Sequence, residues 1–228
     1  VADAKMKMYN LDGSEGKMCG NGIRCVGKFL YDHGMVDINE KDEITIETLS
    51  GIKKLKAYTS GGKVNRLRVD MGKAILDPKE IPVVLDGDKV VDRPVEIAGK
   101  NYNITCVSMG NPHCVVFMDD IDNLDIETVG PEFENDKLFP ERVNTEFVTV
   151  LDDHTIKMRV WERGSGETWA CGTGACAVAV AACENGFCKK GEDIKIKLKG
   201  GDLIINYTDE TVYMTGNAEK VFEGEVEV

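Results

Sequence analysis

Two segments of the sequence place a cysteine and a G-x-G spacing directly before a run that reads as a helix. The first is KMCGNGIRCVGKFLYDHG at residues 17–34, and the second is ETWACGTGACAVAVAACENG at residues 167–186. We predict helices from about Asn21 to His33 and from about Thr173 to Asn185. Each predicted helix is followed by a glycine, which commonly ends a helix in a left-handed conformation.

The second predicted helix is apolar on almost every face, and such a helix belongs inside a structure, covered by a sheet. The segment after it, DIKIKLKGGDLIINY at residues 193–207, alternates apolar and polar residues around a Gly-Gly turn. This alternation predicts two half-buried strands. Further strands are predicted at residues 5–9, 101–110, 113–119, 146–152 and 155–162.

The two helix segments belong to a long internal repeat. A shift of 152 residues places Cys19 on Cys171 and Gly34 on Gly186, and slightly smaller shifts align the strands that follow. We therefore predict an α/β (α+β) chain of two pseudo-symmetric domains, each a curved mixed β-sheet or barrel around one buried central helix. The first half is expected at residues 1–80 and the second at residues 81–216. A final strand at residues 217–228 is expected to return to the first half.

Composition narrows the range of partners. The chain has 228 residues, of which 42% are hydrophobic and 30% charged, and its net charge is −12. Nucleic acids and anionic membranes bind basic surfaces, so this charge argues against both, whereas a small anionic substrate needs only local donors. No apolar run approaches the roughly 20 residues that span a bilayer. Since no signal peptide is visible either, we expect a cytoplasmic protein whose eight cysteines stay reduced.

A cysteine at the start of a helix is a candidate reactive thiol. The unpaired N–H groups and partial positive charge of a helix N-terminus stabilise an anion, so we expect lowered pKa values for Cys19 and Cys171. The same N–H groups suit a carboxylate. A lone cysteine of this kind is more often a small buried residue, but two at equivalent positions of a repeat favour a paired function. The others are interpreted as small hydrophobic residues: Cys25, Cys106, Cys114, Cys176, Cys183 and Cys188.

Two thiols on opposite sides of one carbon can invert a stereocentre. One thiolate removes a proton from one face, the other thiol donates a proton to the opposite face, and the helix N-termini stabilise the charge that develops. Geometry and desolvation can replace a cofactor in such a reaction. No pyridoxal-binding lysine or phosphate loop is visible, and the cysteine and histidine spacings do not match a zinc site. We therefore expect neither a cofactor nor a metal.

Four ordered motifs together resemble the diaminopimelate epimerase family: YNLDGSEGKMCGNGIR, SMGNPHCVVF, FPERVNTEF and WERGSGETWACGTGACA. The resemblance runs from Asp3 to the end of the chain. It implies an isomerase that converts LL-2,6-diaminopimelate to meso-diaminopimelate without a cofactor, in lysine and peptidoglycan precursor biosynthesis. It also implies two pseudo-symmetric halves with the site between them, while monomer and homodimer both stay open.

The resemblance implies a role for each matching residue. The catalytic acid–base pair is matched by Cys19 and Cys171. Positions whose backbone holds the reacting carboxylate are matched by Gly20, Asn21, Gly172 and Thr173. Residues that fix the distal, non-reacting end of the substrate are matched by Asn10, Asn111, Asn144 and Arg163. A carboxylate that holds an amino group is matched by Glu162, and a histidine that tunes the thiols is matched by His113.

Simpler interpretations of these residues stay open. Asn10 and Asn144 also fit turns, Glu162 and Arg163 also fit a surface ion pair, and a buried histidine such as His113 is often only a core residue. The family also begins with a further segment carrying a G-x-G-N-D-F-like stretch, which this sequence does not match. We therefore expect the first half to lack its opening segment, which is either cut off or carried on another chain.

Two other functions compete with this one. Proline and hydroxyproline racemases also use paired cysteines, but their usual motif, M-C-G-H-G, has histidine where Asn21 stands here. A non-catalytic protein that binds anions or metal ions at the same helix ends is the second alternative. Loss of the substrate α-hydrogen to solvent distinguishes an enzyme from a binder.

Overall fold

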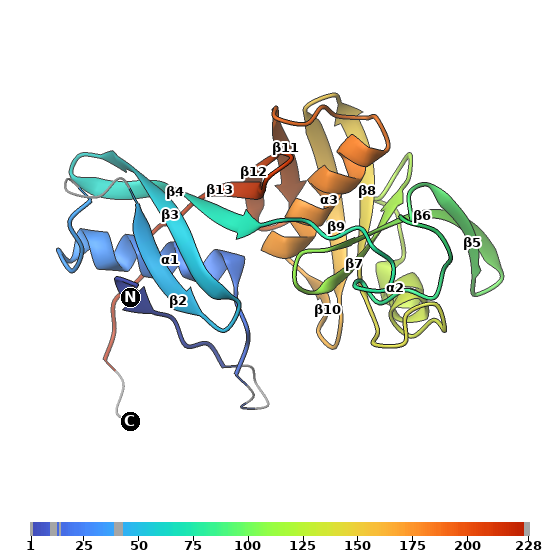
Figure 1. Ribbon diagram of the computed structural model, residues 1–228, viewed down its shortest axis with the longest axis horizontal. Helices are drawn as coiled ribbons and strands as arrows, with labels where there is room; N and C mark the ends of the chain where they lie inside the picture. The colour runs from blue at the N-terminus through green and yellow to red at the C-terminus, as the bar shows by residue number, and fades with distance from the viewer. Residues whose placement is uncertain (1, 10–12, 14, 39–42, 226–228) are drawn as a thin grey trace. The chain divides into compact units, whose positions relative to one another are not determined.

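The computed structural model describes residues 2–9, 13, 15–38 and 43–225 (Figure 1). The chain divides into two compact units. Unit 1 comprises Val1–Val69 and Thr215–Val228, and unit 2 comprises Asp70–Met214. The chain passes from one unit to the other within two strands, β4 (Lys63–Gly72) and β13 (Val212–Asn217).

In its described residues, unit 1 is a small mixed sheet that carries one helix. Strand β1 pairs in parallel with β2, whereas β2, β3 and β4 form an antiparallel meander. Helix α1 packs against this sheet, and a Cβ atom on Gly27 would lie 2.7 Å from the Leu67 side chain and 2.9 Å from that of Leu55. Only glycine allows the helix to lie this close. The elements before β4 are β1 (Ala4–Lys5), α1 (Gly20–Asp32), β2 (Ile44–Thr48) and β3 (Gly51–Ser60).

Unit 2 is a larger mixed sheet with two helices. Its strands follow the order β12-β11-β9-β8-β7-β6-β5, and β10 pairs with β9. The pairs β7–β8 and β9–β11 are parallel. The elements are β5 (Arg93–Ile97), β6 (Lys100–Ser108), β7 (Pro112–Phe117), α2 (Ile126–Glu134), β8 (Asn144–Asp152), β9 (Thr155–Glu162), β10 (Gly166–Thr168), α3 (Gly172–Glu184), β11 (Asp193–Leu198) and β12 (Gly201–Tyr207).

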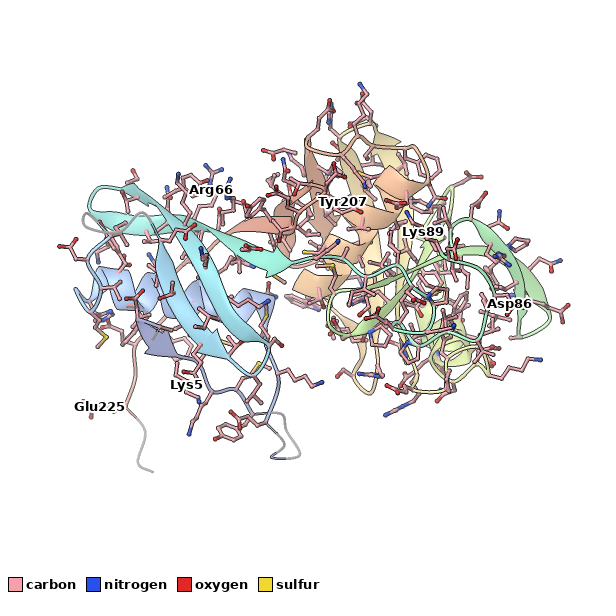
Figure 2. The ribbon with its side chains drawn as sticks, viewed as in Figure 1. Lys5, Arg66, Asp86, Lys89, Tyr207 and Glu225 are labelled. Carbon is pink, nitrogen blue, oxygen red and sulfur yellow. The ribbon has the colours of Figure 1, made fainter. Side chains whose placement is uncertain are left out.

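Helix α3 is the central helix of unit 2. It contacts β6, β7, β8, β11 and β12, so the sheet curves around it (Figure 1). Every residue from Ala175 to Ala182 is fully buried, because small side chains on all faces let strands pack on all sides. Glu184, the last residue of α3, accepts hydrogen bonds from Lys89 at 2.9 Å and from Tyr207 at 3.3 Å. The two donors, Lys89 and Tyr207, are labelled in Figure 2.

The fold confirms most sequence-based expectations and corrects three. The α+β class is confirmed, as are both helices, to within one residue at each end, and the strand-rich middle. Gly34 and Gly186 have φ of 66° and 79°, as expected of glycines that end helices. The opening strand is β1 rather than residues 5–9, because the pairing with β2 stops at Lys5. The last strand is β13, and residues 218–225 that follow it form no strand.

Helix α2 is the third difference, since the sequence analysis did not predict it. Gly130 and Pro131, both of which disfavour helix interiors, lie inside it. A Cβ atom at Gly130 would lie 2.3 Å from the Trp161 ring, so glycine makes room for this packing. Among the described helices, none is long and apolar enough to be a candidate membrane span.

Candidate active site

Cys171 is the N-cap residue of α3. Its backbone is extended, with φ −123° and ψ 112°, and its Sγ accepts a hydrogen bond from the N–H of Gly174 at 3.3 Å. Gly172 and Thr173 form the start of the first helical turn. The sulfur therefore occupies the place where a capping oxygen commonly binds the unpaired N–H groups of a helix.

Cys19 has the same geometry at the start of α1. Its φ and ψ are −129° and 116°, and its Sγ accepts a hydrogen bond from the N–H of Gly22 at 3.3 Å. Gly20 and Asn21 begin this helix as Gly172 and Thr173 begin α3. The predicted placement of both cysteines at equivalent helix N-termini is therefore confirmed. The two cysteines differ in exposure: Cys171 is buried, whereas Cys19 is half-buried.

The electrostatic surroundings of Cys171 contradict the predicted fall of its pKa. Burial raises the pKa of this thiol well above its ordinary value, and the carboxylates of Glu162 and Glu146 raise it further. The hydrogen bonds from Thr173 and Gly174 act in the opposite direction but are outweighed. The prediction considered only the helix N-terminus, whereas desolvation disfavours the charged thiolate more strongly.

A series of polar side chains connects Cys171 to the interior of the sheet. Nδ1 of His113 lies 2.7 Å from Oε1 of Glu146, and its Nε2 lies 3.1 Å from Oδ1 of Asn111. Nδ2 of Asn111 donates to Oγ1 of Thr173 at 3.3 Å, and that oxygen lies 3.5 Å from the Cys171 sulfur. The structure thus brings together four of the residues singled out from the sequence, and adds a fifth, Glu146, that the sequence analysis missed.

Asn144 and Arg163 are joined through the backbone. Asn144 lies at the start of β8 rather than in a turn, where its Nδ2 donates to the carbonyl of Pro112 at 2.9 Å. Its Oδ1 accepts the backbone N–H of Arg163 at 2.9 Å, and Nη1 of Arg163 donates to the carbonyl of Glu141 at 2.8 Å. Glu162, beside Arg163, accepts a hydrogen bond from the Thr168 hydroxyl.

The turn after Arg163 depends on Glu134, a buried carboxylate at the end of α2. Its oxygens accept hydrogen bonds from Nε1 of Trp161 at 2.7 Å, from the N–H of Gly164 at 2.9 Å and from Arg142 at 3.1 Å. The sequence analysis missed Glu134 because α2 itself was not predicted. No local pattern marks the residue, since two of its three partners, Trp161 and Gly164, lie 27 and 30 residues further along the chain.

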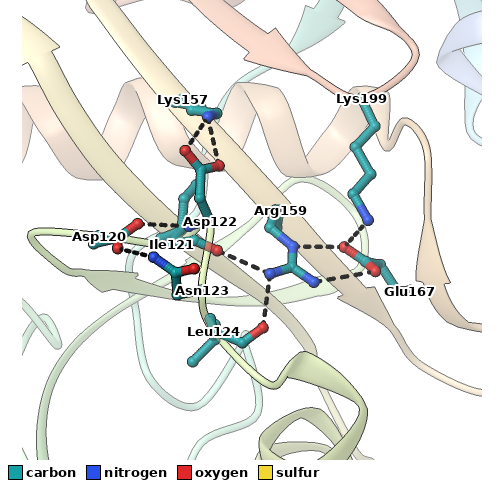
Figure 3. A network of polar contacts seen from close by, with 9 residues as sticks. All are labelled: Asp120, Ile121, Asp122, Asn123, Leu124, Lys157, Arg159, Glu167 and Lys199. Carbon is teal, nitrogen blue, oxygen red and sulfur yellow. Dashed lines mark hydrogen bonds and ion pairs between the residues drawn. The ribbon is translucent and has the colours of Figure 1, made fainter.

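A polar network fixes β10, the strand that leads into the start of α3 (Figure 3). Arg159 donates from Nε and Nη2 to the Glu167 carboxylate at 2.8 and 3.3 Å, while Nη1 binds the carbonyls of Ile121 and Leu124. Lys199 lies 2.7 Å from the same carboxylate. Partial burial acts to raise the pKa of Glu167, but its hydrogen bonds from Arg159 and Lys199 outweigh this effect and lower it.

Asn10 is the one site residue predicted from the sequence that lies outside the described residues. Within the residues that the structure describes, no group of three or more histidine, cysteine, aspartate or glutamate side chains could hold a metal ion.

Comparison with known proteins decides the family. The model of the diaminopimelate epimerase family matches residues 1–76 and 105–221. This chain belongs to the diaminopimelate epimerase family. Among curated family members, a diaminopimelate epimerase from Agathobacter rectalis is 52% identical over 100% of this chain and 81% of its own length. Another from Acetivibrio thermocellus is 53% identical over 100% of this chain and 80% of its own length.

Solved structures extend the likeness of the fold beyond the diaminopimelate epimerase family. A probable proline racemase from Agrobacterium radiobacter has a TM-score of 0.71 at 17% identity, covering 95% of this chain and 69% of its own. A PhzF-family phenazine biosynthesis protein from Bacillus anthracis has a TM-score of 0.65 at 18% identity, covering 100% of this chain and 82% of its own. At these identities, the likeness concerns the fold alone.

Proposed function

We propose that this chain epimerises LL-2,6-diaminopimelate to meso-diaminopimelate, with the thiols of Cys19 and Cys171 as the acid–base pair. Membership of the diaminopimelate epimerase family supports the reaction and its small-molecule substrate. The observation that carries the mechanism is that each sulfur caps its own helix with the same backbone geometry and the same N–H···S distance. The product would serve lysine and peptidoglycan precursor biosynthesis, in the cytoplasm.

The proposed reaction moves one proton at each sulfur. A thiolate on one cysteine takes the α-proton, and the thiol of the other donates a proton to the opposite face of the same carbon. When Cys19 is the base, Cys171 acts as the acid, a role that suits a thiol whose pKa is raised by burial. The roles exchange when the reaction runs in the other direction.

The other site residues are proposed to bind the two ends of the substrate. The reacting carboxylate binds the N–H groups of helix starts, where charge develops as the α-proton leaves. The residues proposed for this role are Gly20, Asn21, Gly172 and Thr173. Those proposed for the distal end are Asn10, Asn111, Asn144 and Arg163, with Glu162 for an amino group. Asn144 already fixes the backbone of Arg163, which supports a shared role for the two.

Hydrogen exchange in D2O tests this proposal. With LL-diaminopimelate as substrate, product should carry deuterium at the inverted carbon from the first turnover, whereas remaining substrate should carry much less. C19A and C171A should each abolish epimerisation in both directions, because each direction needs both groups. The matched control is C25A, which changes an exposed cysteine on the same helix as Cys19. Near-normal epimerisation by C19A or C171A would overturn the assignment of the pair.

Proline serves as the second substrate in the same experiment. The solved structures with a similar fold include a probable proline racemase, so proline racemisation is the competing reaction to test. Racemisation of proline, with none of diaminopimelate, would replace the proposed substrate. Binding of diaminopimelate without any loss of its α-hydrogen would identify a non-catalytic protein.

A further inference from the structure

The buried carboxyl group of Glu146, on strand β8, lies against the start of α3. The side chains of Glu146 and His113 have no exposed surface and lie on neighbouring strands, β8 and β7. Oε1 of Glu146 binds His113, whereas Oε2 is buried without a hydrogen-bond partner in the structure as described. A Cβ atom on Gly174 would lie 2.6 Å from Oε1, so the carboxyl group directly contacts the first turn of α3.

Four hydrogen-bonded contacts join this acid to the sulfur of Cys171. We call the series Glu146, His113, Asn111, Thr173 and Cys171 the buried relay. All its members belong to unit 2. Its inner links connect groups that can each donate on one side and accept on the other, so the direction of one bond fixes the direction of the next.

In the direction that the structure shows, the buried relay stabilises a thiolate. Oδ1 of Asn111 can only accept, so Nε2 of His113 must carry a hydrogen. Nδ2 of Asn111 donates to Oγ1 of Thr173, which leaves the hydroxyl hydrogen of Thr173 available for the sulfur. The Glu146–His113 pair then holds one proton more than a carboxylate with a neutral imidazole.

In the opposite direction, the buried relay stabilises a thiol. If Nε2 of His113 carries no hydrogen, it must accept a hydrogen bond from Nδ2 of Asn111. This requires the side-chain amide of Asn111 to flip, so that Nδ2 and Oδ1 exchange places. The Thr173 hydroxyl then donates to Asn111, and the S–H group of Cys171 donates to Thr173. The number of protons is the same in both directions. One negative charge lies on the sulfur in the first direction and on the Glu146 carboxylate in the second.

We propose that Glu146 is a positioning residue that, through the buried relay, determines whether Cys171 is a thiolate able to remove a proton or a thiol able to donate one. This inference rests on the acid–base role proposed above for Cys171. It explains why an unexposed carboxylate lies beside a thiol that must change its protonation in every turnover.

The charges around the buried relay agree with one shared negative charge. Burial raises the pKa of Glu146, although the neighbouring His113 partly opposes this. Burial likewise raises the pKa of Cys171, and the charge of Glu146 raises it further. Glu162 faces both groups and adds to this effect on each. Two anions at the ends of the relay would therefore be unfavourable together.

The pH dependence of Cys171 alkylation by iodoacetamide, quantified on the peptide by mass spectrometry, tests the proposal. E146Q removes the charge but keeps the shape, so the midpoint pH should fall by about one unit. The alkylation rate at about pH 8 should then rise about threefold, since the gain in thiolate exceeds the loss of nucleophilicity. T173V removes the hydroxyl that the thiolate needs, so the midpoint should rise. T173S should restore it.

Thr145 supplies the matched control. It is next to Glu146 in the sequence, and its hydroxyl is buried without a hydrogen-bond partner in the structure as described. T145V should therefore leave the midpoint for Cys171 unchanged. The readout is the sulfur itself, so a failure of the proposed epimerase activity would not alter it.

A double variant separates the relay from a direct effect of charge through space. If the relay carries the coupling, E146Q should shift the midpoint less than half as far in the T173V background as in the wild type. Equal shifts in both backgrounds, or no shift on E146Q, would overturn the proposal.

Nitrogen-15 NMR of the wild-type histidines gives a measurement that needs no variant at Glu146. Nε2 of His113 should carry a hydrogen at every pH at which Cys171 alkylates as a thiolate. The exposed histidines, His33 and His154, are assigned by substitution with glutamine. A His113 without hydrogen on Nε2 beside a Cys171 thiolate would contradict the relay.

Discussion

A Cβ atom on Gly174 would lie 2.6 Å from Oε1 of Glu146. Glycine is a poor residue for a helix interior, and alanine is better by about 1 kcal/mol. The glycine at this position of α3 therefore makes room for the buried carboxylate. Without that room, neither the hydrogen bond from Gly174 to the Cys171 sulfur nor the contact of Glu146 with His113 could keep its geometry.

We predict that G174A lowers the stability of unit 2 in spite of the better helix propensity. The new methyl group must displace Glu146, which should cost about 1–3 kcal/mol and lower the melting temperature measured by calorimetry. The matched control is G22A at the equivalent position of α1. There a Cβ atom would lie 3.5 Å from its nearest neighbour, which is ordinary contact. G22A should be neutral or stabilising, and an equal loss in both variants would contradict this account.

We predict that E167Q weakens the anchor of β10. The Glu167 carboxylate binds Arg159 and Lys199 (Figure 3), so its loss should cost about 1 kcal/mol at neutral pH and reduce kcat. Because the pKa of Glu167 is lowered in the folded chain, its contribution is complete above its ordinary value of 4.5 and is lost as the pH falls through the folded pKa.

Urea unfolding at about pH 7 and about pH 4 measures this pH dependence. The stability difference between wild type and E167Q should shrink at the lower pH. The control is D122N, which removes an exposed partner of Lys157 in the same network and should change stability little. A difference that does not change with pH would show that Glu167 acts through packing rather than charge.

We predict that E134A loosens the turn that carries Arg163. Three donors lose their common acceptor, including the indole N–H of the half-buried Trp161, so stability should fall by about 1–3 kcal/mol. KM for diaminopimelate should rise more than kcat falls, since the turn positions a residue proposed to bind the distal end. E132A, at an exposed position of the same helix, should leave both constants unchanged. A fall in kcat alone would separate Glu134 from substrate binding.

The parts of the site that the sequence predicted are those set by local patterns. The cysteine before G-x-G and the glycine after each helix define α1 and α3 almost to the residue, because caps are local features. Glu146 and Glu134 could not be predicted, since His113, Trp161 and Gly164 bind them from 27 to 33 residues away in sequence and are brought close only by the folded chain. The predicted lowering of the Cys171 pKa was wrong for a related reason. The helix N-terminus is visible in the sequence, but burial is not.

Arg163 provides the last prediction, which concerns the selectivity of substrate binding. Its side chain already donates to the carbonyl of Glu141, which orients the guanidinium. R163K keeps the charge but loses the planar pair of donors that binds a carboxylate at two points. We expect kcat/KM for diaminopimelate to fall about tenfold or more, which corresponds to about 1.4 kcal/mol of transition-state binding. Alkylation of Cys19 and Cys171 should stay normal, because neither thiol depends on Arg163. The control is R66K, which changes an arginine stacked on Tyr58 in unit 1. Unchanged kcat/KM in R163K would place the distal carboxylate at another residue.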